Sequence, residues 1–205
     1  MMVTGIYTAV KVDTGIDIDI APEVYNPSDD SYLLVNVIEV SPDERVLDVG
    51  TGTGIAALHA AKAGARVTAV DINPHAVACA RSNALKNDLK VEVLQSDLFE
   101  KVVGLYNVIT FNPPYLPDEN APSSWAERAW SGGADGAEVV VRFLEDAWRF
   151  LAPNGRIFII LSSFGSIRTV LRTAKERYDI EMVEEKHMFF ESILAYRMSV
   201  KKSNP

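Results

Sequence analysis

The 205-residue chain is 48% hydrophobic, enough for one sizeable core, so we expect a single domain over residues 1–205. Its formal net charge of −8 disfavours direct binding to DNA or RNA, because both are dense polyanions. The single cysteine, Cys79, excludes an internal disulfide, and we expect no metal site. The sequence shows no signal peptide and no apolar run of about 20 residues, so we expect a cytoplasmic protein with no membrane partner.

Strand and helix patterns alternate along the chain. An edge strand is expected at 16–20, where IDIDI alternates, and a capped helix at 28–40; both belong to an extension, residues 1–44, that packs on the core. The core elements expected after it are strand Arg45–Val49, helix 54–64, strand Arg66–Asp71, helix 73–88, strand 90–95, strand Tyr106–Phe111, helix 136–151, strand 156–161, helix 165–177, and strands 180–184 and 189–199. This order predicts an α/β fold with a parallel sheet, helices on both faces, and a ligand crevice beyond the carboxyl ends of the strands.

A glycine-rich loop, DVGTGTG, follows the strand Arg45–Val49. Gly50, Gly52 and Gly54 let the backbone turn tightly and let a ligand approach closely. A nicotinamide dinucleotide site uses G-x-G-x-x-G and holds a pyrophosphate, which the carboxylate of Asp48 would repel. The ammonium and sulfonium groups of S-adenosylmethionine would instead be attracted by that carboxylate, so the charge pattern favours this cofactor.

Two further acids end the next two strands. Asp71 lies about 20 residues after the glycines, where an acid accepts hydrogen bonds from ribose hydroxyls. Asp97 is placed to accept from an adenine amine, with Leu98 packing on the ring. Taken singly, each acid fits a helix cap or a solvated loop equally well, but three acids at successive strand ends favour a nucleoside pocket.

The tetrapeptide NPPY follows the fourth core strand. The side-chain oxygen of Asn112 and the backbone carbonyl of Pro113 can accept hydrogen bonds from a planar NH2 group, which favours attack by its nitrogen on a methyl group. Pro113 and Pro114 stiffen the loop, and Tyr115 offers a ring on which a planar group can stack. The glycine-, proline- and serine-rich connection that follows, up to residue 135, is long for a compact domain and favours a functional loop.

Together these motifs resemble the class I methyltransferases, and within them the HemK-like glutamine N5-methyltransferases that modify peptide release factors. The resemblance runs from about residue 24 to residue 161, and residues 24–34 (VYNPSDDSYLL) resemble the short N-terminus of the archaeal and eukaryotic HemK2 branch. It implies a Rossmann-like fold with a seven-stranded, mostly parallel sheet, and the cofactor S-adenosylmethionine.

The resemblance also implies roles for individual residues. The cofactor would be held by Ser31, Asp48, Gly50, Gly52, Gly54, Asp71, Asp97, Leu98 and Asn112, and the substrate glutamine by Asn112, Pro113, Pro114 and Tyr115. Members of this branch pair with a small zinc-binding, Trm112-like activator at an apolar sheet edge. Val91, Val93 and Leu94 fit such an edge, and equally fit an ordinary core or edge strand.

Three other functions are open at this point. Adenine N6-methylation of DNA or RNA would use the same NPPY chemistry, but the acidic charge and the lack of a target-recognition domain oppose it, so nucleic acid is expected only indirectly. A non-catalytic cofactor-binding scaffold is opposed by the intact Asn112. A dinucleotide oxidoreductase is opposed by Asp48. The leading prediction is methylation of the GGQ glutamine of a release factor.

Overall fold

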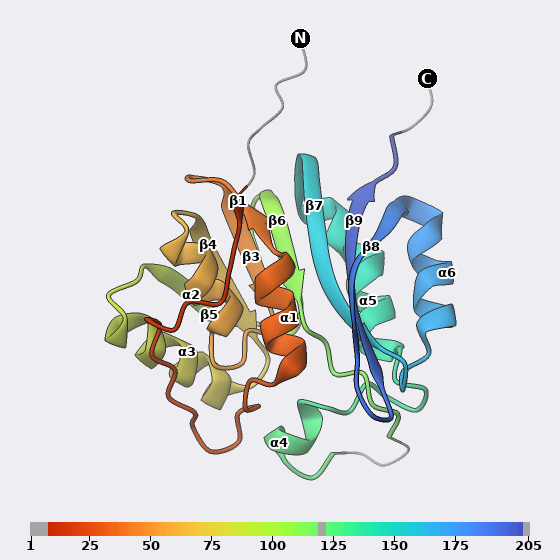
Figure 1. Ribbon diagram of the computed structural model, residues 1–205, viewed down its shortest axis with the longest axis horizontal. Coiled ribbons are helices and arrows are strands. Elements are labelled where there is room, and N and C mark those ends of the chain that lie inside the picture. Colours follow the sequence, from red (N-terminus) through yellow and green to blue (C-terminus); the bar gives the residue numbers. More distant parts are fainter. Residues whose placement is uncertain (1–7, 119–121, 203–205) are drawn as a thin grey trace.

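The computed structural model describes residues 8–118 and 122–202, which form a seven-stranded sheet with helices on both faces (Figure 1). The strands lie in the order β5-β4-β3-β6-β7-β9-β8, and β9 alone runs in the direction opposite to the other six. Their bounds are β3 (Arg45–Val49), β4 (Arg66–Asp71), β5 (Val91–Gln95), β6 (Tyr106–Phe111), β7 (Leu151–Ser162), β8 (Tyr178–His187) and β9 (Ser192–Val200). The Rossmann-like fold predicted from the sequence is therefore confirmed.

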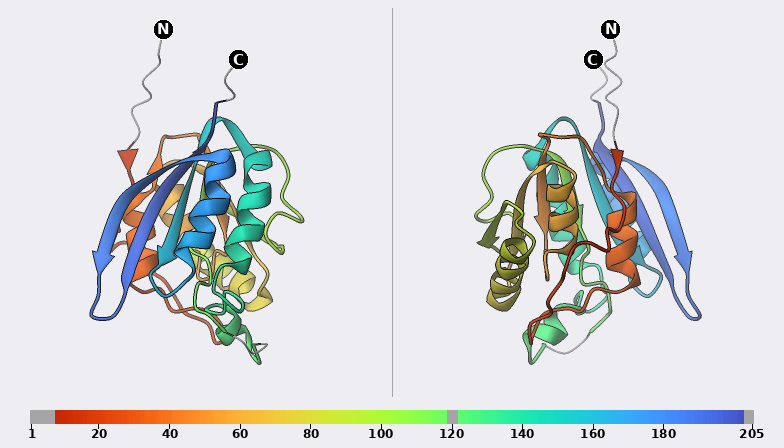
Figure 2. Two further views of the ribbon diagram at one scale, coloured as in Figure 1. Left: turned by 90° about the vertical axis from the view of Figure 1, so that its right-hand side faces the viewer. Right: turned by 60° about the vertical axis from the view of Figure 1, so that its left-hand side comes forward.

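The helices divide between the two faces. One face is covered by α1 (Asp29–Val37), α2 (Ile55–Lys62) and α3 (Pro74–Lys86), and the other by α5 (Glu138–Ala147) and α6 (Ile167–Arg177) (Figure 2). A short helix, α4 (Trp125–Arg128), lies apart from both layers, at the end of the sheet where the parallel strands finish (Figure 1). A 3₁₀ turn, η1 (Trp148–Phe150), joins α5 to β7.

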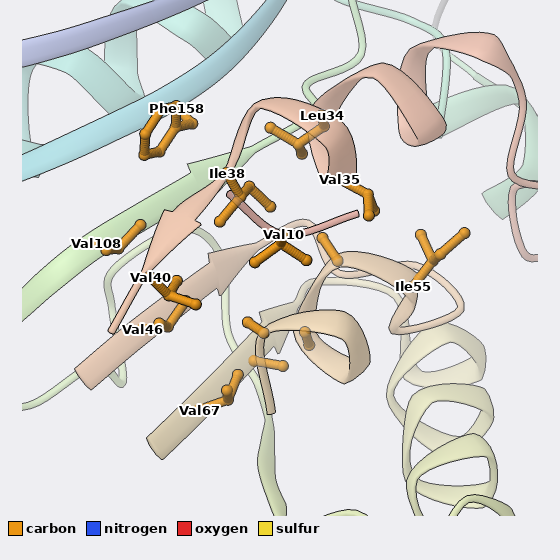
Figure 3. Packing of buried hydrophobic residues seen from close by; sticks show 14 of the residues in the cluster. Val10, Leu34, Val35, Ile38, Val40, Val46, Ile55, Val67, Val108 and Phe158 are labelled. Atoms are coloured by element: carbon orange, nitrogen blue, oxygen red, sulfur yellow. The ribbon is translucent and has the colours of Figure 1, made fainter. Parts of the chain in front are cut away.

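Two hydrophobic cores follow from this division. Successive residues of a strand point to opposite faces, so Val46 and Val108 pack under α1 and α2, whereas Leu47 and Ile109 pack under α5 and α6. Figure 3 shows the first core, with Ile38 at the end of α1 pointing toward the sheet residues Val46 and Val108. Because both faces of the central strands are buried, most residues of these strands are apolar.

The strand expected at 16–20 was wrong. Residues 17–19 pair with no strand among the described residues. Two asparagine side chains take that place, one in α3 and one at its C-terminal cap. Asn83 accepts from the backbone amide of Asp19 and donates to its carbonyl, both at 2.9 Å, and Asn87 does the same for Asp17 at 2.8 Å. Asparagines one helical turn apart therefore match alternate residues of an extended chain.

Other elements differ from expectation in their ends. The helix expected at 28–40 stops at Val37, because Ile38 turns extended and β2 (Glu39–Val40) then pairs with β1 (Thr8–Ala9). The helix expected at 136–151 is shorter as well, since β7 begins already at Leu151. In the two described parts of the chain, no helix combines the length and the apolarity needed to cross a membrane.

Candidate active site

A cavity of ≈ 600 Å³ opens at the carboxyl ends of β3, β4, β5 and β6. Ligands of open α/β sheets bind at such strand ends, and small-molecule sites occupy about 300–1,000 Å³. The N-terminal turn of α1 and the segment around α4 form the remaining walls. Of the twelve residues singled out from the sequence, eleven line this cavity: Ser31, Asp48, Gly50, Gly52, Asp71, Asp97, Leu98, Asn112, Pro113, Pro114 and Tyr115.

The glycine loop leaves open space in the cavity. Gly52 has φ +57°, and a Cβ built there would meet no atom within 4 Å, so the loop presents bare backbone to the cavity. Its amide donates to Asp71 Oδ2 at 2.9 Å, which fixes the loop against the end of β4. Gly54, expected beside the cofactor, does not line the cavity. A Cβ at this position would lie 3.2 Å from the Cβ of Ala80 in α3. Its small size serves the packing of α2 on α3.

Asp48, near the end of β3, is a buried carboxylate at the cavity wall. It is 2% exposed, and its two oxygens accept from the hydroxyls of Thr110 and Thr51, each at 2.6 Å. Burial raises the pKa of Asp48 to about 6, although both hydroxyl donors lower it. A positively charged ligand in the cavity would favour the ionised form of Asp48, because it would supply a counter-charge to the carboxylate.

The other two acids, Asp71 and Asp97, also have polar partners within the protein. Asp71 accepts from the backbone amides of Gly52 and Asn73, each at 2.9 Å, and burial raises the pKa of its carboxyl. Asp97 Oδ2 pairs at 3.0 Å with Arg142 of α5, and its side chain is 30% exposed. The pairing to Arg142 turns one carboxylate oxygen toward α5, and Oδ1 has no partner among the described residues.

The NPPY tetrapeptide places one unpaired acceptor inside the site. The side-chain amide of Asn112 donates to Ser31 Oγ at 3.4 Å, while its Oδ1 is buried and has no hydrogen-bond partner among the described residues. An unsatisfied buried acceptor is unfavourable and calls for an explanation, such as a ligand that donates to it. Pro113, Pro114 and Tyr115 continue the cavity wall beside it.

A buried acid that the sequence analysis missed, Asp30, holds this wall together. Its carboxylate accepts from the hydroxyls of Tyr25 (3.1 Å), Tyr115 (3.3 Å) and Ser31 (3.1 Å). Burial, with the negative charge of Asp30 beside it, raises the pKa of Tyr115, so the phenol stays protonated and remains a donor. In the sequence Asp30 is one of two acids in a helix first turn. It is only 3% exposed, and its burial depends on contacts with Tyr115, 85 residues away.

The long connection after NPPY folds back over the cavity. Its two described arms pair through Leu116, whose amide donates to the carbonyl of Trp130 at 2.9 Å; residues 119–121 lie outside the description. The carboxylate of Glu23 caps α4 by accepting from the amides of Trp125 (2.9 Å) and Ala126 (3.2 Å). Helix α4 is thus anchored to a segment 102 residues earlier in the chain, and Trp125 and Trp130 line the cavity.

Comparison with known proteins agrees with this site. Residues 26–191 match the model of the family described as "Methyltransferase small domain". The chain belongs to this methyltransferase family. It is 37% identical over 185 residues to a putative protein N5-glutamine methyltransferase of Methanocaldococcus jannaschii, covering 88% of this chain and 93% of that protein. It is 32% identical over 169 residues to methyltransferase HEMK2 of Mus musculus, covering 76% and 79%.

A solved methyltransferase has the same fold. Mtq2 of E. cuniculi, in a complex with Trm112 described as responsible for the methylation of the translation termination factor eRF1, superposes with a TM-score of 0.69. The two chains are 22% identical, and the match covers 87% of this chain and 99% of the other. The resemblance to HemK-like methyltransferases inferred from the sequence is therefore confirmed, and this chain belongs to the HemK2 branch of the family.

Proposed function

We propose that the protein is an S-adenosylmethionine-dependent methyltransferase that methylates the side-chain amide of a glutamine in a peptide release factor. The observation that carries this is Asn112 Oδ1, a buried acceptor without a described partner, placed in a cavity wall beside two prolines and a tyrosine. Relatives named protein N5-glutamine methyltransferase and HEMK2 support the same activity.

The cavity fits the proposed cofactor. The cofactor would lie against the open backbone at Gly52. The carboxylate of Asp48 would attract its ammonium and sulfonium charges, and Asp71 would accept hydrogen bonds from its ribose hydroxyls. Asp97, through the oxygen that Arg142 leaves free, and Leu98 would hold the adenine, and Ser31 would close the pocket from α1. When bound, the cofactor would supply an electrophilic methyl group on sulfur.

The chain itself would prepare the amide nitrogen. An amide nitrogen is a poor nucleophile because its lone pair is delocalised into the carbonyl. Hydrogen bonds from its two N–H groups to Asn112 Oδ1 and to the carbonyl of Pro113 would favour the more tetrahedral, more positive nitrogen of the transition state. Tyr115, held by Asp30, would fix the plane of the amide. The acceptors lie on a stiff loop, so little reorganisation is needed.

Partners and location are part of the same proposal. The E. cuniculi neighbour is a complex with Trm112, and β5 is an edge strand here, with Val93 buried and Val91 and Leu94 half-buried. We infer that a small zinc-binding, Trm112-like activator pairs with β5. Its proposed substrate acts in translation, which makes the cytoplasm the proposed location.

One assay separates this function from its alternatives. Methyl-labelled cofactor is supplied with a release factor, with the same factor carrying alanine at the GGQ glutamine, and with DNA and RNA, both with and without a Trm112-like subunit. Label on the intact factor alone supports the proposal, and label on nucleic acid contradicts it. Asn112→Ala should lower kcat by at least about 100-fold, the effect of losing one preorganised transition-state hydrogen bond, while the cofactor still binds.

A further inference from the structure

The turn between β8 and β9 exposes two neighbouring aromatic rings. Phe189 is 93% exposed and Phe190 is 84% exposed, and the rings meet edge to face with centroids 5.0 Å apart. Large apolar side chains gathered on a surface mark interaction sites more often than single ones do. We call Phe189 and Phe190 the aromatic tip.

Hydrogen bonds fix the turn that carries the aromatic tip. Met188 donates to the carbonyl of Glu191 at 2.7 Å, which closes the turn, and Ser162 at the end of β7 donates to the Glu191 carboxylate. Beside it, the amide of Ser192 donates to Ser163 Oγ at 2.9 Å. Figure 2 shows the hairpin projecting from the body of the molecule. A loop ordered in advance loses little backbone freedom when a partner binds.

The base of the tip is continuous with the wall of the candidate active site. The loop after Ser163 packs so closely on NPPY that a Cβ at Gly165 would lie 2.9 Å from the carbonyl oxygen of Tyr115. Ser162, which bonds the Glu191 carboxylate, also accepts at its carbonyl from the amide of Gly165 at 3.0 Å, so the base of the tip and this loop are joined. The tip and α4 stand at the same end of the molecule (Figure 1). A glutamine held at NPPY would therefore bring the rest of its protein over the hairpin.

We propose that the aromatic tip is a docking element for the folded protein substrate, which binds it through an apolar surface outside the methylated segment. This inference rests on the proposed function. It separates two tasks: the cavity holds the glutamine, and the tip recognises the protein that carries it. An activator on β5 would leave the tip free, because β5 and β8 are the opposite edges of the sheet.

The test compares two substrates and two double variants, each assayed with and without a Trm112-like subunit. The substrates are the folded release factor and a short peptide that contains the same glutamine. The tip variant is Phe189→Ala with Phe190→Ala. The control is Met182→Ala with Val200→Ala, which shortens two apolar residues of the same hairpin that are 51% and 41% exposed. Val200 pairs with Tyr178, at the end of the hairpin away from the turn.

We expect the tip variant to lower kcat/KM for the folded factor about 30-fold, chiefly through KM, as truncating two anchoring side chains of an interface does. For the peptide, kcat/KM should stay within about twofold, because a short peptide does not reach the tip. The control variant should behave as the wild type on both substrates, and all three proteins should bind the cofactor equally.

Several results would overturn the inference. An unchanged kcat/KM for the folded factor would show that the tip does not dock it, and an equal loss on factor and peptide would place the effect inside the site. A wild-type dimer that the tip substitutions dissociate would assign the rings to self-association, and loss of the Trm112-like subunit would assign them to the activator. If the wild type methylates neither substrate, the proposed function itself fails, a result distinct from all of these.

Discussion

Replacing Asp48 by asparagine should make the protein more stable and its cofactor pocket weaker. Burial raises the pKa of this carboxyl from 3.8 to about 6. At about 1.4 kcal/mol per pKa unit, ionising Asp48 therefore opposes folding by about 3 kcal/mol. The folded state binds more protons than the unfolded state between these two pKa values, so this contribution lowers stability as pH rises from about 4 to about 6 and is constant above.

Asparagine cannot ionise, so Asp48→Asn should escape this loss. From this effect alone, the free energy of unfolding of the variant should exceed that of the wild type by about 3 kcal/mol at about pH 8 and by about 2 kcal/mol at about pH 5.5. The altered hydrogen bonds to Thr51 and Thr110 add the same constant to both differences. Urea unfolding of both proteins at both pH values measures the difference of about 1 kcal/mol between the two gains, from which that constant cancels. A gain that is equal at the two pH values would refute the reasoning.

The same ionisation should control the affinity for S-adenosylmethionine. The carboxylate attracts the positive charges of the cofactor only when it is ionised, so wild-type affinity should rise as pH increases through about 6 and then level off. Asp48→Asn should bind at least about tenfold more weakly at about pH 8, where the wild-type carboxylate is charged. Titration calorimetry over this pH range measures both effects, and a wild-type affinity that is flat across it would contradict the role given to Asp48.

Three other substitutions test the site and its support. Gly52→Val should weaken cofactor binding at least about tenfold in calorimetry, because its side chain would enter the open face of the cavity at φ +57°; unchanged binding would place the cofactor elsewhere. Asn83→Ala should lower the free energy of unfolding in urea by about 3 kcal/mol, since its buried amide bonds both Asp19 and the carbonyl of Thr53; a loss below about 1 kcal/mol would show that water replaces it. Glu23→Gln should speed hydrogen exchange of the α4 amides while changing the free energy of unfolding by less than about 1 kcal/mol. Exchange as slow as in the wild type would show that Glu23 does not stabilise α4.

The parts predicted from the sequence are those that local pattern determines. Strand Arg45–Val49 is buried on both faces from its second residue on, and the sequence predicts it with the bounds that the structure gives. The glycine loop and NPPY were located because each is continuous in sequence and follows a recognisable strand. Parallel strands end at one edge of the sheet, so the fold brings these motifs to one cavity.

The parts that were missed depend on contacts between distant residues. The alternation at 16–20 predicts an extended chain, but it cannot show that Asn83 and Asn87 take the place of a neighbouring strand. Gly54 resembles the other loop glycines, and only the approach of Ala80 shows its packing role. The burial of Asp30 and the cap that Glu23 provides for α4 likewise depend on partners 85 and 102 residues away.

The placement of Asp30 has a thermodynamic consequence. One carboxylate bonds Ser31, on the proposed cofactor side, and Tyr115, on the proposed substrate side. If filling either side shifts that carboxylate, both ligands act on a shared group, and their affinities are no longer independent. Linkage then requires that the factor by which one ligand changes the affinity of the other is the same in both directions. Replacing Asp30 would therefore change both effects by the same factor.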